Sequence, residues 1–406
     1  MKTNNSIKKS LLNANTKTPP AFLCYLVPFV FLGGYLIYLI LNNEMRAPDN
    51  YYLIHFLYTY DHGFVARGFV GEVLSWFFET VSDELIKNVL TAFSALLMIS
   101  AVLCIGKALS KVRDDKHRFW IVAVVAVVIC LLPASFRLYY TDIKSDKLLW
   151  AITLFAVLLA NKKHGVWLVP VLCVIATLVN PVFLFCSMIL ISIILLQEFY
   201  SKGFNTKNGI ICAVSYVSMI ALGVFAIISE KQLGFSTPAE MVDFYFSRYA
   251  GVLSEDLYNG FLTDALFDYF DPANVVLTKA YQLIFEEWGK GSVCVADFIF
   301  LCIPTYTVTV IFWKNCIKQE ENKFQKFIFF LCAISPIVIV PAIILSWDSS
   351  KYFYNNLIVQ LSLLIYFVVQ NNNTVMTVIR NACDFLRNHI IIAVNMLFYF
   401  ASFVIV

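Results

Sequence analysis

The sequence predicts an all-α integral membrane protein, a polytopic bundle of about eleven transmembrane helices. Hydrophobic residues make up 60% of the 406 residues and charged residues only 14%, whereas soluble domains carry roughly a quarter charged residues. The apolar residues also fall in blocks, and about 20 such residues cross the hydrocarbon core of a bilayer. No low-complexity linker interrupts these blocks, so we expect a single integral membrane domain over residues 1–406.

The apolar blocks define the expected spans in chain order. The first block is retained as a span, because it is too long for a signal-peptide core and lacks a small-residue cleavage site. The fourth and fifth blocks are short, so each is expected to be tilted or broken. The expected spans cover residues 21–42, 86–110, 119–136, 148–160, 165–179, 182–199, 208–229, 293–313, 327–347, 355–371 and 389–406.

The distribution of charge predicts the orientation of the bundle. If the N-terminus is cytoplasmic, the segments on its side carry 19 of the 30 Lys and Arg but only 6 of the 27 Asp and Glu. Cytoplasmic loops of membrane proteins are enriched in Lys and Arg. We therefore expect a multi-pass protein of the inner or plasma membrane with a cytoplasmic N-terminus.

Two long segments, 43–85 and 230–292, fall on the outer side in this topology. Both interleave aromatic and acidic residues with helix-like apolar spacing. We expect amphipathic helices at the outer interface, where Trp and Tyr concentrate. The alternative is that these helices only cover the bundle, because amphipathic stripes are usually packing surfaces.

The first outer segment contains a glycine-punctuated stretch, residues 60–71, with the sequence YDHGFVARGFVG. Its glycines indicate a backbone that turns or is approached closely. Asp61 and Arg67, with His62 between them, suit a site that binds an anion and moves a proton. The alternative is a solvated aspartate beside an arginine that anchors lipid headgroups.

A second charged cluster lies between the third and fourth spans, within residues 137–147. Its cations could hold a phosphate, and its carboxylates could bind a divalent ion or an acceptor hydroxyl. The alternative is a short solvated connector. The candidate residues of this cluster are Arg137, Asp142, Lys144, Asp146 and Lys147.

A third outer connection, residues 346–354, supplies Asp348 and Lys351 among aromatic residues. Aromatic faces beside carboxylates suit sugar binding, but the same residues make an ordinary interfacial belt. The sequence contains no HExxH, GxSxG, P-loop or GxGxxG pattern, which argues against standard hydrolase, nucleotide-binding and zinc chemistry.

Together these features resemble the GT-C superfamily of polyprenyl-phosphate-sugar-dependent membrane glycosyltransferases. The resemblance rests on the cytoplasmic N-terminus, the long first outer loop with Asp61, and the acidic segment TDIKSDKLLW before the fourth span. It implies Asp61 as the catalytic base, with His62 and Arg137 among the substrate-binding residues. It further implies Arg67, Lys144 and Lys147 at the phosphate, Asp142 and Asp146 at the acceptor or a metal, and Asp348 and Lys351 lining the pocket.

The resemblance also implies the partners of such a site. The donor would be a polyprenyl-(di)phosphate-linked sugar in the bilayer, and the acceptor a glycan or a lipid, joined by inverting displacement. No nucleic acid is expected as a partner. A divalent cation is the one possible cofactor. The first outer loop lacks a DxD motif, so the sequence does not assign its ligands there.

Other classes of protein remain open at this stage. A polysaccharide polymerase or ligase that joins lipid-linked repeat units would share the donor, the hydropathy and the outer loops. A transporter or flippase is a different class, and the scarcity of ionisable residues at span centres argues against it. A purely structural or sensory protein would leave the clustered outer charges without a role.

Overall fold

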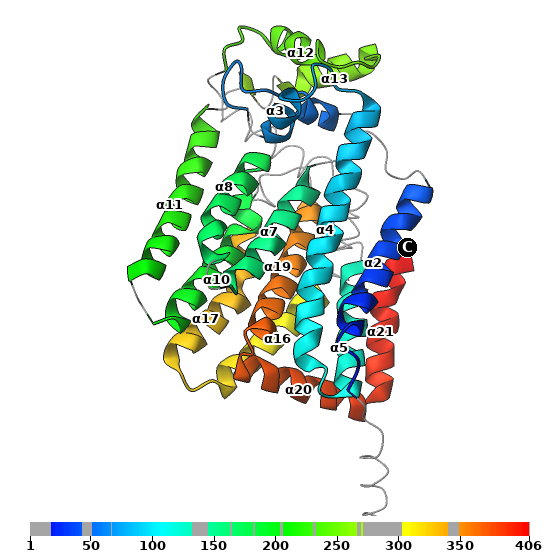
Figure 1. Cartoon of the computed structure of the whole chain (residues 1–406), viewed down its shortest axis with the longest axis vertical. Coiled ribbons are helices and arrows are strands. Elements are labelled where there is room, and N and C mark those ends of the chain that lie inside the picture. Colours follow the sequence, from blue (N-terminus) through cyan, green and yellow to red (C-terminus); the bar gives the residue numbers. More distant parts are fainter. Residues whose placement is uncertain are drawn as a thin grey trace, which may run out of the picture.

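The structure is a computed structural model that describes residues 18–42, 51–65, 67–131, 145–162, 165–181, 183–203, 206–229, 233–265, 269–270, 303–339 and 349–405. Within these residues the regular elements are all helices, which confirms the expected all-α class. Figure 1 shows long helices lying side by side, with the short helices α3, α12 and α13 grouped at one end.

The long helices form the bundle, and each overlaps one of the expected spans. The 3-10 helix η3 (Gly165–Leu168) precedes α8, the short helix α9 (Phe183–Cys186) precedes α10, and η6 (Ser335–Ile339) follows α17. The bundle helices are α2 Leu23–Leu41, α4 Asp83–Val112, α5 Lys116–Leu131, α7 Asp146–Ala160, α8 Val169–Val179, α10 Met188–Ser201, α11 Thr206–Ser229, α16 Ile303–Gln319, α17 Lys323–Ile334, α19 Ser349–Val369 and α21 Ile390–Ile405.

Two helices of the described chain, α2 and α4, are long and apolar enough to cross a membrane. Shorter apolar stretches occupy Gly165–Val179, Met188–Ser201, Gly209–Phe225 and Asn355–Val369. The bundle of helices is therefore established, and the number of membrane crossings stays a prediction.

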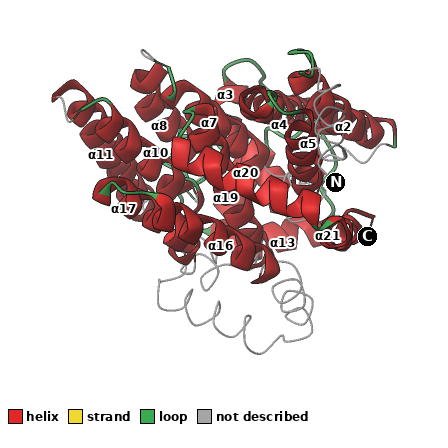
Figure 2. Ribbon diagram, turned by 90° about the horizontal axis from the view of Figure 1, so that it is seen from below, coloured by secondary structure: helices red, strands yellow, loops and turns green. Residues whose placement is uncertain are grey.

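The bundle helices alternate in direction, so their short connections gather at one end (Figure 1). Tyr200 in the last turn of α10 and the helix caps Asn322 and Asn372 line one small cavity of about 310 Å³. Helix α20 (Asn373–Asn388) lies across this same end, as the view from below in Figure 2 shows. We refer to this end as the turn end. The sequence did not predict α20, because its apolar residues make a narrow stripe rather than a continuous block.

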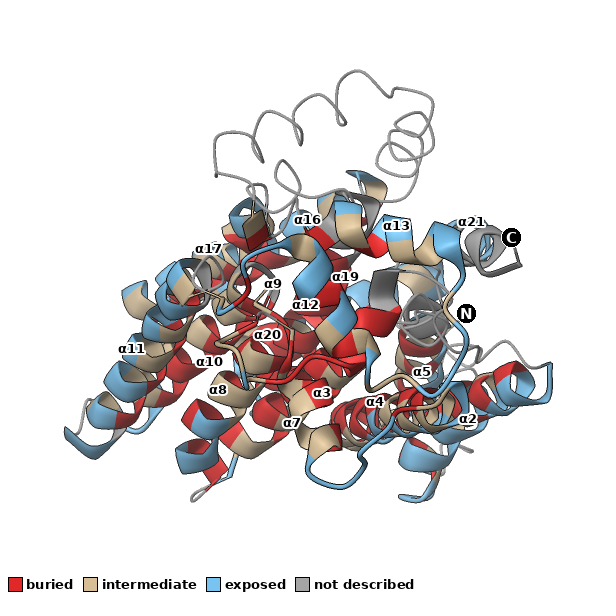
Figure 3. Ribbon diagram, turned by 90° about the horizontal axis from the view of Figure 1, so that it is seen from above, coloured by how far each residue is buried: buried red, intermediate tan, exposed pale blue. Residues whose placement is uncertain are grey.

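Apolar side chains cover the outward faces of the peripheral helices as well as the interior. Viewed from above in Figure 3, α2 and α11 lie on opposite sides of the bundle and carry exposed residues on their outer faces. Phe29 on α2 is 52% exposed, Val217 on α11 is 66% exposed and Ile391 on α21 is 74% exposed. Such extended apolar surfaces are rare on soluble monomers.

The two long outer segments fold together into one unit, the outer layer, which comprises the described parts of residues 51–81 and 233–270. It contains η1 (Tyr51–Phe56), α3 (Phe69–Ser75), α12 (Pro238–Phe246) and α13 (Glu255–Ala265). Its hydrophobic core is separate from that of the bundle and includes Leu57, Tyr58, Met241, Tyr245 and Phe261. The sequence predicted that these segments lie on one side of the protein, but it did not predict that they pack against each other.

Backbone hydrogen bonds join the two halves of the outer layer. The amide of Val81 donates to the carbonyl of Arg248 at 2.8 Å, and the amide of Ala250 donates to the carbonyl of Val81 at 3.0 Å. The amide of Gly234 donates to the carbonyl of His62 at 2.8 Å. These bonds satisfy backbone amide and carbonyl groups that lie outside the helices and therefore lack helical hydrogen bonds.

Helix α4 belongs to both hydrophobic cores. The hydroxyl of Ser82 caps its first turn by accepting from the amide of Leu85 at 3.2 Å, and Asp83 and Glu84 follow. This acidic start favours the helix dipole. At about 45 Å its 30 residues exceed the hydrocarbon thickness of a bilayer. Its first turns therefore reach the outer layer, where Ile86 and Leu90 are buried.

Glycines in residues 60–71 occupy positions that other residues would strain. Gly63 has a φ of 119°, a region that L-residues rarely adopt. A Cβ atom on Gly71 would lie 2.3 Å from the carbonyl oxygen of Tyr58. The expectation that these glycines mark a turn and a close backbone approach is confirmed.

We expect Gly71→Ala to destabilise the outer layer by about 1–3 kcal/mol, because the added methyl overlaps the Tyr58 backbone. Faster proteolysis of the outer layer and a lower melting temperature in detergent would report this change. Gly260→Ala is the control, since Gly260 lies in α13 and a Cβ there meets nothing within 4 Å. Equal stability of the two variants would contradict the close approach at Gly71.

Candidate functional site

Asp61 lies on the exposed surface of the outer layer. The hydroxyl of Thr59 donates to Oδ2 of Asp61 at 2.7 Å, which orients the carboxyl group. The other oxygen keeps its capacity to accept a proton or a hydrogen bond. Asp61 thus has the exposure that a general base needs, and its catalytic role stays a prediction.

Arg248 and Tyr245, from the second half of the outer layer, interact electrostatically with Asp61. Nη1 of Arg248 donates to the carbonyl of Leu57 at 2.7 Å, and the Tyr245 hydroxyl donates to the carbonyl of Thr59 at 3.2 Å. Nη2 of Arg248 is buried and has no hydrogen-bond partner among the described residues. An arginine with a spare donor beside a carboxylate suits an anionic ligand.

The environment of this cluster shifts the pKa values of its members. Burial raises the pKa of the Tyr245 hydroxyl well above its usual value, and the charge of Asp61 adds to the effect. Burial lowers the pKa of Arg248, whereas the nearby Asp61 and Glu72 carboxylates raise it. Tyr245 is therefore a neutral hydrogen-bond donor, and the two carboxylates favour the charged form of Arg248.

Glu72 holds the backbone next to Asp61. Its Oε2 accepts from the amide of Tyr60 at 2.9 Å, and its Oε1 accepts from Nε1 of Trp76 at 3.0 Å. Both carboxylate oxygens are thus engaged within α3 and the preceding segment. Glu72 positions the chain at Asp61 and is not itself a candidate base.

The structure places His62 and Arg67 in different surroundings from Asp61. The His62 ring packs 4.5 Å from the ring of Phe235 and 4.4 Å from that of Phe244, between centroids. This packing is typical of a structural histidine. Arg67 has a φ of 66°, which is strained for a residue with a Cβ. Such strain persists only where the surrounding structure fixes the backbone, and strained residues often lie at functional sites. The anion-binding role of Arg67 stays a prediction.

Asp146 and Lys147 lie in the first turn of α7 and not in a solvated connector. They are only 6% and 1% exposed. Oδ1 of Asp146 accepts from Nδ2 of Asn180 at 2.5 Å, and Nζ of Lys147 donates to the hydroxyl of Ser94 at 3.1 Å. The alternative of a short solvated connector does not hold for these two residues, because α7 begins two residues before the expected span, and their substrate-binding role stays a prediction.

The buried pair nevertheless lies close to the outer layer. Leu148, the next residue of α7, packs against the hydrophobic cores of both the bundle and the outer layer. Asp146 and Lys147 therefore lie where the bundle meets the unit that carries Asp61. Arg137, Asp142, Lys144 and Asp348 fall outside the described residues, and so does the side chain of Lys351, whose backbone belongs to α19 rather than to a loop.

A possible divalent cation finds no cluster of ligands in the part of the chain that the structure describes. No group of three or more His, Cys, Asp or Glu side chains there could hold a metal ion. The expected ligand Asp142 lies outside that part. We derive no step through a metal.

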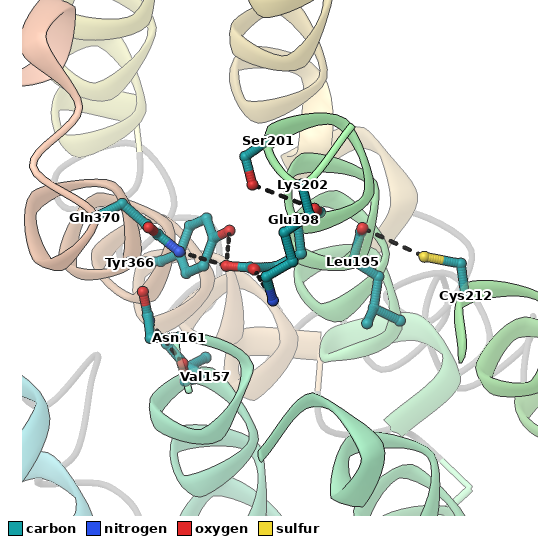
Figure 4. Close-up of polar contacts among 9 residues, drawn as sticks. All are labelled: Val157, Asn161, Leu195, Glu198, Ser201, Lys202, Cys212, Tyr366 and Gln370. Carbon is teal, nitrogen blue, oxygen red and sulfur yellow. Dashed lines mark hydrogen bonds and ion pairs between the residues drawn. The ribbon is translucent and has the colours of Figure 1, made fainter. Parts of the chain in front are cut away.

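A further polar cluster lies near the turn end, where Glu198 is only 3% exposed (Figure 4). Oε1 of Glu198 accepts from the Tyr366 hydroxyl at 2.8 Å and from the side-chain amide of Gln370, and Oε2 pairs with Nζ of Lys202 at 2.6 Å. Both oxygens are engaged, as expected of a structural carboxylate that joins α10 to α19.

Several residues around the candidate site were not predicted from the sequence. Asn180 lies between the expected spans 165–179 and 182–199, and Arg248 and Tyr245 lie in the second long outer segment, so none of them was a candidate. No local sequence pattern could have identified Arg248. Its hydrogen-bond partner Leu57 lies 191 positions away in the chain.

Comparison with known proteins gives no match to this chain among family models, curated proteins or solved structures.

We expect Asn180→Ala to lower the stability of the bundle by about 1–3 kcal/mol, because the buried Asp146 loses a hydrogen-bond donor. The melting temperature in detergent should fall by several degrees. Thr177→Val is the control one turn earlier in α8, since the Thr177 hydroxyl bonds only to the carbonyl of Cys173 in the same helix. Equal melting temperatures for the two variants would argue against a structural bond between α7 and α8.

Proposed function

We propose that this protein is a multi-pass membrane glycosyltransferase. It transfers a sugar from a polyprenyl-(di)phosphate-linked donor to a glycan or lipid acceptor on the non-cytoplasmic face. The observation that carries the proposal is that an exposed, oriented Asp61 lies within electrostatic range of the anchored Arg248. Both lie in a folded layer at the end of the bundle opposite the basic connections.

Membrane insertion is supported by the surface and by the direction of the helices. The outward faces of α2, α11 and α21 are apolar and exposed, as lipid contact requires. The connections rich in Lys and Arg gather at the turn end, which we assign to the cytoplasm. In this topology the outer layer lies outside, and about eleven helices cross the bilayer.

The proposed reaction is an inverting displacement at the anomeric carbon of the donor. The acceptor oxygen forms a bond to that carbon while its proton passes to the Asp61 carboxylate. The bond from the anomeric carbon to the phosphate oxygen breaks, and its electron pair stays on the departing phosphate. Arg248, with Arg67 as a second cation, neutralises that charge.

A transporter or flippase is less well supported by the positions of the buried ionic groups. Asp146 and Lys147 lie in the first turn of α7, and Glu198 lies in the last turn of α10. Transport sites usually place such groups near the middle of the bilayer. A polymerase or ligase of lipid-linked repeat units would use the same donor chemistry, and acceptor analysis distinguishes it from a transferase of single sugars.

We expect Asp61→Asn to reduce sugar transfer in proteoliposomes by about 10²–10⁴-fold, because the amide cannot accept the acceptor proton. The assay follows a panel of polyprenyl-linked sugars with purified protein at matched amounts. Asp256→Asn is the control, since Asp256 is an exposed aspartate on α13 of the same layer. Unchanged transfer by Asp61→Asn would overturn the assignment of the base, and no consumption of any donor would turn attention to transport.

We expect a membrane-impermeant maleimide to label Ser236→Cys in intact cells and Glu321→Cys only after the membrane is opened. Ser236 lies in the outer layer and Glu321 between α16 and α17, and both are exposed. The unmodified protein gives the background, which the burial of most described cysteines should keep low. Labelling in the reverse order would contradict the proposed orientation.

A further inference from the structure

An apolar groove opens on the side of the bundle near the turn end. It has a volume of about 530 Å³ and lies between α5, α16, α19 and α21, with the last turn of α20 at one end. Sites for small molecules commonly enclose about 300–1,000 Å³. Neither the candidate site nor the proposed reaction uses this groove, and none of its lining residues belongs to the outer layer.

The polar atoms of the groove wall are already engaged within the protein. Oε1 of Gln360 accepts from Nε1 of Trp313 at 2.7 Å, and Nε2 of Gln360 donates to the Ser335 hydroxyl at 2.7 Å. The Thr309 hydroxyl donates to the carbonyl of Tyr306 at 3.0 Å. The remaining lining is mostly hydrocarbon, so the groove suits an apolar chain.

The rim of the groove is exposed on the bundle surface. Trp120 on α5 is 42% exposed, Val308 on α16 is 48% exposed and Val394 on α21 is 41% exposed. In the proposed topology this rim contacts the lipid of the cytoplasmic leaflet. A chain could therefore enter sideways from the bilayer.

An arginine and a histidine line the groove at its end toward α20. Arg387, in the last turn of α20, and His117, in the first turn of α5, both line it and are exposed. The neighbouring carboxylates of Asp384 and Asp115 face Arg118, at 3.6 and 3.9 Å. Arg387 is thus placed to meet an anion at the membrane surface.

From this combination we infer that the groove binds one hydrocarbon chain of an anionic phospholipid from the cytoplasmic leaflet. The chain lies against Leu361 and Val308, and the headgroup phosphate pairs with Arg387. The inference rests on membrane insertion with the turn end in the cytoplasm, and it is independent of the transferase reaction. Occupancy would join α5, α16 and α19 to α21 through the lipid.

The test is native mass spectrometry of the full-length protein with phosphatidylglycerol or phosphatidylcholine of identical chains. We expect phosphatidylglycerol to bind more tightly, and Arg387→Gln to weaken it about fivefold and phosphatidylcholine less, because choline offsets the charge of its phosphate. Arg380→Gln, at the other arginine of α20, should leave both affinities unchanged. Leu361→Trp fills the groove and should weaken both lipids more than tenfold.

Two results would overturn the inference. The first is wild-type affinity for phosphatidylglycerol in a folded Leu361→Trp variant, which would place the lipid elsewhere. If that variant does not fold, Val308→Trp at the exposed rim decides the point in the same way. The second is an equal loss of affinity in Arg387→Gln and Arg380→Gln, which would reveal diffuse attraction to the surface and not a headgroup site.

Discussion

The hydrogen bonds between Val81 and the Arg248–Ala250 segment hold together two parts of the chain that the bundle helices α4 to α11 separate. They fix the register of the outer layer, and the buried Tyr58, Tyr245 and Met241 then pack behind them. Arg248 lies within electrostatic range of Asp61 only because this register is kept. The two outer segments thus share one hydrophobic core, which neither segment could form alone. This core holds the charged groups of the layer in place.

Two clusters of buried polar groups lie toward the two ends of the bundle. Asp146, Lys147 and Asn180 lie beneath the outer layer, whereas Glu198, Tyr366 and Gln370 lie toward the turn end. Each cluster joins helices through bonds to a buried carboxyl group: the first joins the consecutive helices α7 and α8, and the second joins α10 to α19. Between them the helices meet mainly through apolar contacts. Buried polar groups must be matched by defined partners, so these clusters fix the relative positions of helices that apolar packing alone would leave freer to slide.

The sequence predicted the helices well, because each long apolar block can satisfy its backbone only as a helix. It also predicted the turn at Gly63 and the close backbone approach at Gly71. Glycine is the residue that tolerates both, so its presence in a short segment is informative by itself. It could not predict that Asn180 bonds to Asp146 or that Arg248 lies within electrostatic range of Asp61, because both depend on packing between separate elements. The amphipathic helix α20 was not predicted for a related reason. Its narrow apolar stripe is explained only by the end of the bundle on which it packs.

The pairing of the two halves of the outer layer also imposes an order on biosynthesis. Arg248 is synthesised 191 residues after Leu57, its hydrogen-bond partner, so at ordinary translation rates the first half waits about 10–40 s for the second. During that interval Leu57 and Tyr58 lack the partners that bury them in the folded protein, while the helices between the two halves are synthesised. The nascent first half therefore exposes an apolar surface that chaperones can bind, and the emergence of residues 233–265 covers it.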